Sequence, residues 1–94
     1  MRVDSHVVHC KKARFDIYIG RPSLFGNPFS IGKHGDRVEV IEKYRVYFLE
    51  RVARDEQFRS AVESLRGKVL ACWCRPLACH GDVIVEYLER GGSA

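Results

Sequence analysis

The sequence predicts a small α/β domain in two or three layers, with three helices on a sheet of about three mainly parallel strands. Three observations predict this class: strand-like alternation in "FDIYIG", helical spacing of apolar residues after Asp36, and the almost continuously apolar "KVLACW". The expected order is β-β-α-α-β-α. Because the chain has 94 residues and shows no linker or internal repeat, we expect a single domain over 1–94.

The N-terminal part of the chain contains two predicted strands and a long loop. Val7–Cys10 is a short β-prone run, and Phe15–Ile19 carries apolar side chains at alternate positions, which is the period of a strand. Gly20 ends the second strand. The next segment, "RPSLFGNPFSIGKHG", contains two prolines and three glycines, too many for a helix or a strand. Its four large apolar residues indicate a loop that is packed against the rest of the domain.

Two helices are predicted after this loop. The first begins at Asp36, because Asp36 and Glu39 have the spacing of a capping box. Its apolar stripe has spacings of three and four and consists of Ile41, Tyr44, Phe48 and Val52, widened by Val40 and Tyr47. The second helix is expected over about 55–66, with Gly67 as the residue that ends it.

The C-terminal part of the chain predicts a buried strand and a last helix. Lys68–Trp73 is apolar on both faces for most of its length, which is typical of a strand covered on both sides, and Pro76 prevents its continuation. The last helix begins around Gly81–Asp82 and ends at the glycine pair 91–92.

The topology predicts where a functional site would lie. If the strands Phe15–Ile19 and Lys68–Trp73 are parallel neighbours, their carboxyl ends meet at one edge of the sheet. The loops that follow them, Arg21–Phe29 and Cys74–Asp82, would then face each other. Open α/β sheets bind ligands in the crevice outside the carboxyl ends of their strands. We therefore expect a site between these two loops.

The residue types in the two loops favour a phosphate-bearing or otherwise anionic small ligand, such as a nucleotide. Arginine forms charge-assisted hydrogen bonds to such groups, and the N-terminus of the last helix favours an anion. Asparagine can bind a polar edge of the ligand, and glycine lets a ligand approach the backbone closely. The candidate ligand-binding residues are Arg21, Ser23, Asn27, Gly81 and Asp82. For Asp82, a helix N-cap is the alternative role.

Cys74 and His80 are the candidate catalytic residues. A thiol near a helix N-terminus and basic side chains is readily ionised and becomes nucleophilic, and histidine can act as general acid or base. Transfer or hydrolysis is the expected class of reaction if the protein is an enzyme, because no cofactor fingerprint such as G-x-G-x-x-G is present. Whether the protein is an enzyme stays open.

Zinc binding is the alternative interpretation of the same segment. Cys72, Cys74, Cys79 and His80 are chemically suitable ligands. Their spacing is unfavourable, because the β-carbons of Cys72 and Cys74 on one strand face lie roughly 6 to 7 Å apart. Two thiolates on one zinc ion need sulfurs about 3.8 Å apart. We therefore expect no cofactor, with zinc as the alternative, and Cys72 can equally be a small buried side chain.

Composition limits the partners. The net charge of +4 and the pI near 9 permit nucleic acid, and a zinc-stabilised or basic nucleic-acid-binding module is a second hypothesis. The basic residues are spread among acidic ones, which weakens that signal. No run reaches the roughly 18 to 20 apolar residues of a membrane span, and the first residues lack a signal-peptide core. We expect a cytoplasmic protein with reduced thiols and no membrane partner.

Two stretches, "IYIGRPSLFGNPF" and "LRGKVLACWCRPLACHGDVIVEYL", resemble the small bacterial and phage proteins of the domain of unknown function 4326 family. The family pattern consists of "IGR", "GNPF", "KYR" and "L-x-C-W-C-x-P-x-x-C-H-G-D-V", which fall here on 19–21, 26–29, 43–45 and 70–83. The resemblance covers nearly the whole chain. It implies that the two predicted loops are the family's defining segments, and it implies no activity. For a phage-like protein, inhibition of a host protein is a third hypothesis.

Overall fold

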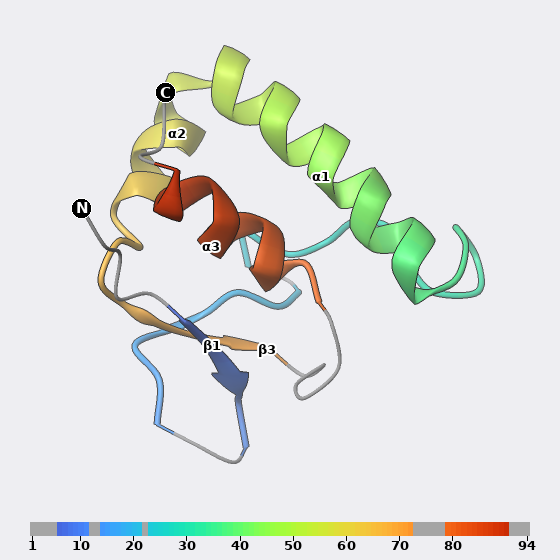
Figure 1. Cartoon of the computed structure of the whole chain (residues 1–94), viewed down its shortest axis with the longest axis horizontal. Coiled ribbons are helices and arrows are strands. Elements are labelled where there is room, and N and C mark those ends of the chain that lie inside the picture. The colour runs from blue at the N-terminus through green and yellow to red at the C-terminus, as the bar shows by residue number, and fades with distance from the viewer. Residues whose placement is uncertain (1–5, 12–13, 22, 73–78, 91–94) are drawn as a thin grey trace.

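The computed structural model describes residues 6–11, 14–21, 23–72 and 79–90. Its elements in chain order are β1 (His6–His9), β2 (Ile17–Tyr18), α1 (Arg37–Arg54), α2 (Glu56–Glu63), β3 (Val69–Cys72) and α3 (Gly81–Glu89) (Figure 1). The predicted α/β class and the order β-β-α-α-β-α are confirmed.

The sheet is fully parallel, with β3 in the centre of the order β1-β3-β2. Val7 of β1 and Ile17 of β2 both pair with Leu70 of β3, so these three side chains point to the same face. Because both outer strands run parallel to β3, all three carboxyl ends lie at one edge of the sheet. The prediction that the second strand and the last strand are parallel neighbours is correct.

β2 is shorter than the predicted strand Phe15–Ile19, although its pairing extends further. The backbone N–H of Asp16 donates to the Val69 carbonyl (2.8 Å), and that of Ile19 donates to the Ala71 carbonyl (2.9 Å). The Asp16 carboxylate in turn accepts from the Val69 N–H (2.8 Å). Phe15 is exposed, so the predicted apolar face begins only at Ile17.

The molecule has two layers, because all three helices lie on one side of the sheet (Figure 1). α3 packs on β1 and β3, and α1 contacts α2 and α3. The core between the layers contains buried residues of every element but β2, together with Ile19 and Phe25 from the segment after β2. On the other face Ala71 is fully buried between its strand partners Val8 and Tyr18. The prediction that the last strand is covered on both sides therefore holds without a second helical layer.

α1 begins as the sequence predicts. The Glu39 N–H donates to the Asp36 carboxylate (2.9 Å), and the Asp36 N–H donates to the Glu39 carboxylate (2.9 Å), which completes the capping box. The buried residues of α1 are Val40, Tyr44, Phe48 and Val52, whereas Ile41 and Tyr47 are only partly buried. The predicted stripe is thus shifted slightly toward Val40.

Asp55 separates α1 from α2. Its backbone N–H donates to the Arg51 carbonyl (2.8 Å) at the end of α1, and its carboxylate accepts from the Phe58 N–H (3.0 Å) at the start of α2. α2 is shorter than the predicted 55–66 and is followed by a turn that leads to Gly67, whose φ is +79°. A positive φ favours glycine, which explains the residue at this position.

No helix among the residues that the structure describes is both long and apolar enough to span a bilayer.

Candidate functional site

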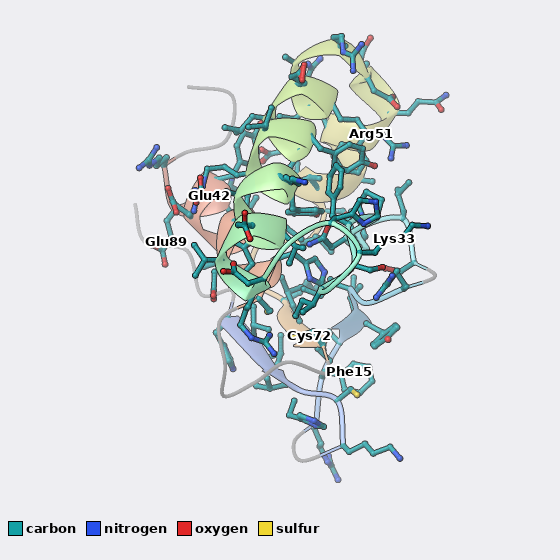
Figure 2. All side chains as sticks on the ribbon, turned by 90° about the vertical axis from the view of Figure 1, so that its right-hand side faces the viewer. Phe15, Lys33, Glu42, Arg51, Cys72 and Glu89 are labelled. Atoms are coloured by element: carbon teal, nitrogen blue, oxygen red, sulfur yellow. The ribbon has the colours of Figure 1, made fainter. Side chains whose placement is uncertain are left out.

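A pocket of about 400 Å³ lies at the carboxyl edge of the sheet, where the topology predicts a site. Figure 2 views the molecule from this side, with Cys72 at the end of β3 beneath the N-terminal part of α1. The pocket is lined by residues from β2, the loop after it, α1, the end of β3 and the start of α3. They are Tyr18, Gly20, Arg21, Asn27, Ile31, Arg37, Val40, Ile41, Cys72, Cys79 and His80.

The pocket joins the two segments on which the prediction depends. Arg21 and Asn27 come from the first predicted loop, and Cys79 and His80 come from the second. The pairing of β2 with β3 brings them together, because each segment leaves the sheet at the same edge. Residues 73–78 lie outside the described part of the chain, so the predictions for Cys74 fall outside it too.

Hydrogen bonds hold the first loop against α1. The buried Tyr44 hydroxyl donates to the Phe25 carbonyl (2.9 Å), and Phe25 itself is part of the core. The Asn27 side-chain N–H donates to the Val40 carbonyl (3.1 Å), and its side-chain oxygen accepts from the Phe29 N–H (2.9 Å). Asn27 therefore has a structural role in addition to its place in the pocket wall. These contacts confirm that the loop is packed at Phe25 and Asn27, whereas Leu24 and Ile31 are exposed.

Two arginines line the pocket from different elements. Arg21 follows β2, is exposed, and donates to the Ser30 hydroxyl (2.9 Å). Arg37 is the first residue of α1 and is partly buried. Gly20 precedes Arg21 and leaves room for the Tyr18 ring, whose hydroxyl donates to the Arg21 carbonyl (3.1 Å). The pocket therefore carries two positive charges beside an aromatic ring.

His80 is the buried polar residue of the pocket. Its side chain is 7% exposed, and its Nε2 lies 2.7 Å from the Ile19 carbonyl oxygen. Burial lowers the pKa of His80, more than the hydrogen bond to Ile19 raises it, so the neutral ring is favoured. Because a carbonyl oxygen only accepts, Nε2 carries the proton and Nδ1 is the acceptor nitrogen. The Tyr44 ring contacts the imidazole edge to face, with centroids 5.1 Å apart.

Cys72 and Cys79 form a buried thiol pair in the pocket wall. Both are reduced, and their sulfur atoms lie 3.1 Å apart. The hydrogen bond with Cys72 and burial raise the pKa of Cys79. His80 is directed at the Ile19 carbonyl, and the described residues contain no group of three metal-ligating side chains. The zinc alternative therefore depends on Cys74, which lies outside the described residues.

Three predicted ligand-binding residues lie outside the pocket wall. Gly81 is buried, and a β-carbon there would lie 2.7 Å from Val7 and 2.8 Å from Ile19, so this glycine permits close helix–sheet packing. The Asp82 carboxylate accepts from the N–H of Cys79 (3.1 Å), which precedes α3. The alternative role of Asp82 as helix N-cap is wrong, because His80 is the N-cap and Asp82 lies in the first turn of the helix. The Ser23 hydroxyl is buried and has no hydrogen-bond partner among the described residues.

Sequence reasoning missed the contribution of α1 to the pocket. Arg37, Val40 and Ile41 line it because α1 begins directly beside the loop that Asn27 fastens to Val40. The capping box already fixed where α1 starts, so the first turn of this helix was the available signal. Ile31 is an exposed apolar residue of the loop, and it lines the pocket.

Comparison with known proteins places this architecture in a family. The family described as "Domain of unknown function (DUF4326)" matches residues 5–90. The chain is also 38% identical over 85 residues to the "Uncharacterized 12.4 kDa protein in nrdA-td intergenic region" of Enterobacteria phage T4, covering 89% of this chain and 77% of that protein. No solved structure matches significantly. Because the match spans nearly the whole chain and includes both pocket-forming segments, the protein belongs to the DUF4326 family.

Proposed function

We propose that the pocket binds a small molecule with a phosphate or another anionic group, such as a nucleotide. The observation that carries the proposal is the convergence of Arg21, Arg37 and His80 on one pocket whose remaining wall is largely apolar. Its volume of about 400 Å³ lies within the range of small-molecule sites. A mixed lining of this kind suits a ligand with a charged end and a flat or apolar end.

The positive charges define the anionic end of the ligand. Arg21 and Arg37 are the cations of the pocket, and a guanidinium forms paired hydrogen bonds to phosphate oxygens. The start of α3 is a weaker anion site, because the Asp82 carboxylate already accepts from the Cys79 N–H. The proposal therefore assigns the anion to the arginines.

The apolar part of the pocket lining suits an apolar or aromatic group. Tyr18, Ile31 and Ile41 belong to it, and Ile31 is 54% exposed in the absence of a ligand. Covering an exposed isoleucine side chain is favourable by about 1.5 to 3 kcal/mol when burial is complete. A nucleobase or a comparable ring offers a flat apolar surface for these side chains.

His80 supplies a further polar group in the pocket lining. Its Nδ1 accepts a hydrogen bond when Nε2 donates to the Ile19 carbonyl, so it is suited to a hydroxyl or amino group of the ligand. If a reaction takes place in the pocket, this neutral nitrogen can accept a proton from the ligand.

A thermal-shift screen tests the proposal. The probes are the four common nucleoside 5′-monophosphates and inorganic phosphate, with wild type, Arg21→Ala and, as a matched control, Arg54→Ala at the far end of α1. Because a hydrogen bond to a charged group contributes about 1.5 to 3 kcal/mol, Arg21→Ala is expected to weaken binding by about 10- to 100-fold. Arg54→Ala should keep the wild-type affinity.

Other outcomes would contradict the proposal. If none of the probes stabilises the wild type, or if both arginine variants respond equally, the pocket is not an anion site. Binding to mixed-sequence DNA or RNA that weakens steeply with salt would support the nucleic-acid hypothesis instead.

A further inference from the structure

We infer that Cys72 and Cys79 form a reversible disulfide in the wall of the pocket, so that the pocket contains an oxidation site. Their sulfur atoms lie 3.1 Å apart, whereas a disulfide bond is about 2.05 Å long. Closing the bond needs a movement of about 1 Å. The inference depends on the pocket as an access route and not on the identity of the proposed ligand.

The location of the pair distinguishes it from two cysteines that merely pack in the core. Cys72 ends β3 and Cys79 lies two residues before the start of α3, and both residues are 1% exposed. Nevertheless, both line the pocket, so an oxidant as small as hydrogen peroxide can reach the sulfur atoms from that side. Two side chains of the inner core would have no such route.

The chemistry is balanced with a peroxide as oxidant. The Cys72 thiolate attacks the O–O bond of hydrogen peroxide, which gives a sulfenic acid and hydroxide. Cys79 stays a thiol, because its hydrogen bond with Cys72 and burial raise its pKa. The second thiol then attacks the sulfenic sulfur and releases water. The proton lost by the first thiol combines with the hydroxide to form water. In total, two thiols and one peroxide molecule give one disulfide and two water molecules. A dithiol reductant reverses the reaction by thiol–disulfide exchange.

The bond would connect two elements at the pocket. It links the carboxyl end of β3 to the start of α3, next to His80, whose Nε2 contacts the Ile19 carbonyl. Because the two sulfur atoms are part of the pocket wall, oxidation changes the shape of that wall. We therefore expect the oxidised and reduced forms to differ in affinity for any ligand that reaches Cys72.

Mass spectrometry of the purified full-length protein tests the inference. The protein is treated with hydrogen peroxide, its remaining thiols are alkylated under denaturing conditions, and it is cleaved with chymotrypsin. Cleavage after Trp73 and Leu77 puts Cys72, Cys74 and Cys79 on three different peptides. The expected result is a loss of two hydrogen atoms, a crosslink between the Cys72 and Cys79 peptides, and full reversal by dithiothreitol.

Cysteine variants provide the controls. Cys10→Ser should still form the crosslink, because Cys10 lies outside the pocket, whereas Cys72→Ser and Cys79→Ser should lose it completely. If either buried substitution prevents folding, the crosslinks found in the wild-type protein still show whether Cys72 and Cys79 form a disulfide. A crosslink through Cys74 or Cys10, oxidation to sulfinic acid without any crosslink, or about one zinc per chain in the purified protein would overturn the inference. None of these outcomes depends on nucleotide binding, so the inference and the proposed function fail separately.

Discussion

At the scale of single residues, burial decides the state of His80. The side chain is almost fully enclosed and donates to the Ile19 carbonyl, so the pocket contains a neutral imidazole. Burial lowers the pKa of His80 below its ordinary value of 6.5. The unfolded chain therefore binds more protons than the folded protein when the pH lies between the lowered pKa and 6.5.

This difference predicts how stability depends on pH. The free energy of unfolding should be fully retained above pH 6.5 and should decrease as the pH falls from there through the lowered pKa of His80. His80→Gln keeps a donor for the Ile19 carbonyl and removes the titration, so its stability should fall less between pH 7.5 and 5. Urea unfolding of both proteins at the two pH values measures this. Equal losses in both would contradict the assignment.

Asn27 predicts a stability effect that is independent of ligand binding. Asn27→Ala removes the hydrogen bonds to the Val40 carbonyl and from the Phe29 N–H. We expect a loss of about 1 to 3 kcal/mol in the free energy of unfolding. Asn27→Asp keeps the acceptor for the Phe29 N–H but sets a carboxylate oxygen against the Val40 carbonyl, so it should also be less stable than the wild type. Chemical denaturation gives the values; if Asn27→Ala were as stable as wild type, the loop would not depend on these contacts.

The residues of the site were predictable to different degrees. Arg21 and His80 were predicted from residue type and strand order, and both line the pocket. Gly81 and Asp82 lie outside the pocket wall, where the glycine permits close helix–sheet packing and the carboxylate accepts from a backbone N–H group. Sequence patterns give the position of a residue along an element, but not the groups that it contacts in the folded protein.

At the scale of elements, local signals set the helix boundaries well. The spacing of Asp36 and Glu39 predicted the start of α1, and both hydrogen bonds of the capping box are present. The end of α2 was predicted too late, because the positive φ of Gly67 ends the turn after the helix and not the helix itself.

The cap of α1 also supports the pocket, since Arg37 and Val40 follow it directly. Asp36→Ala should lower the free energy of unfolding by about 1 kcal/mol, and Asp36→Ser should retain most of the stability because serine is also a good N-cap. Thermal or urea unfolding of the two variants distinguishes them. An Asp36→Ala variant as stable as the wild type would show that the cap contributes nothing.

Gly81 predicts how closely α3 must approach the sheet. In Gly81→Ala the new β-carbon would lie 2.7 Å from Val7 and 2.8 Å from Ile19, so we expect a loss of about 1 to 3 kcal/mol in stability. Combining it with Val7→Ala removes the closer of these two contacts and leaves the one with Ile19. The double variant should therefore be more stable than the sum of the two single losses predicts. Strict additivity would contradict the close approach.

At the scale of the whole molecule, the parallel sheet determines where the site lies. Two segments more than 40 residues apart meet because β2 and β3 run in the same direction and end at the same edge. That convergence could be predicted from the helical crossover between them. The first turn of α1 could not be placed there in the same way, because helix packing depends on tertiary contacts such as that of Asn27 with Val40.

The central claim is that this shared edge forms a binding pocket for an anionic small molecule. Titration of the isotope-labelled protein with a nucleoside 5′-monophosphate, followed by backbone amide NMR, tests it most directly. We predict saturable shifts concentrated at Gly20, Arg21, Arg37, Ile41 and His80, with little change at the far end of α1 near Arg54. Absent shifts, or saturable shifts gathered on another face of the molecule, would contradict the account.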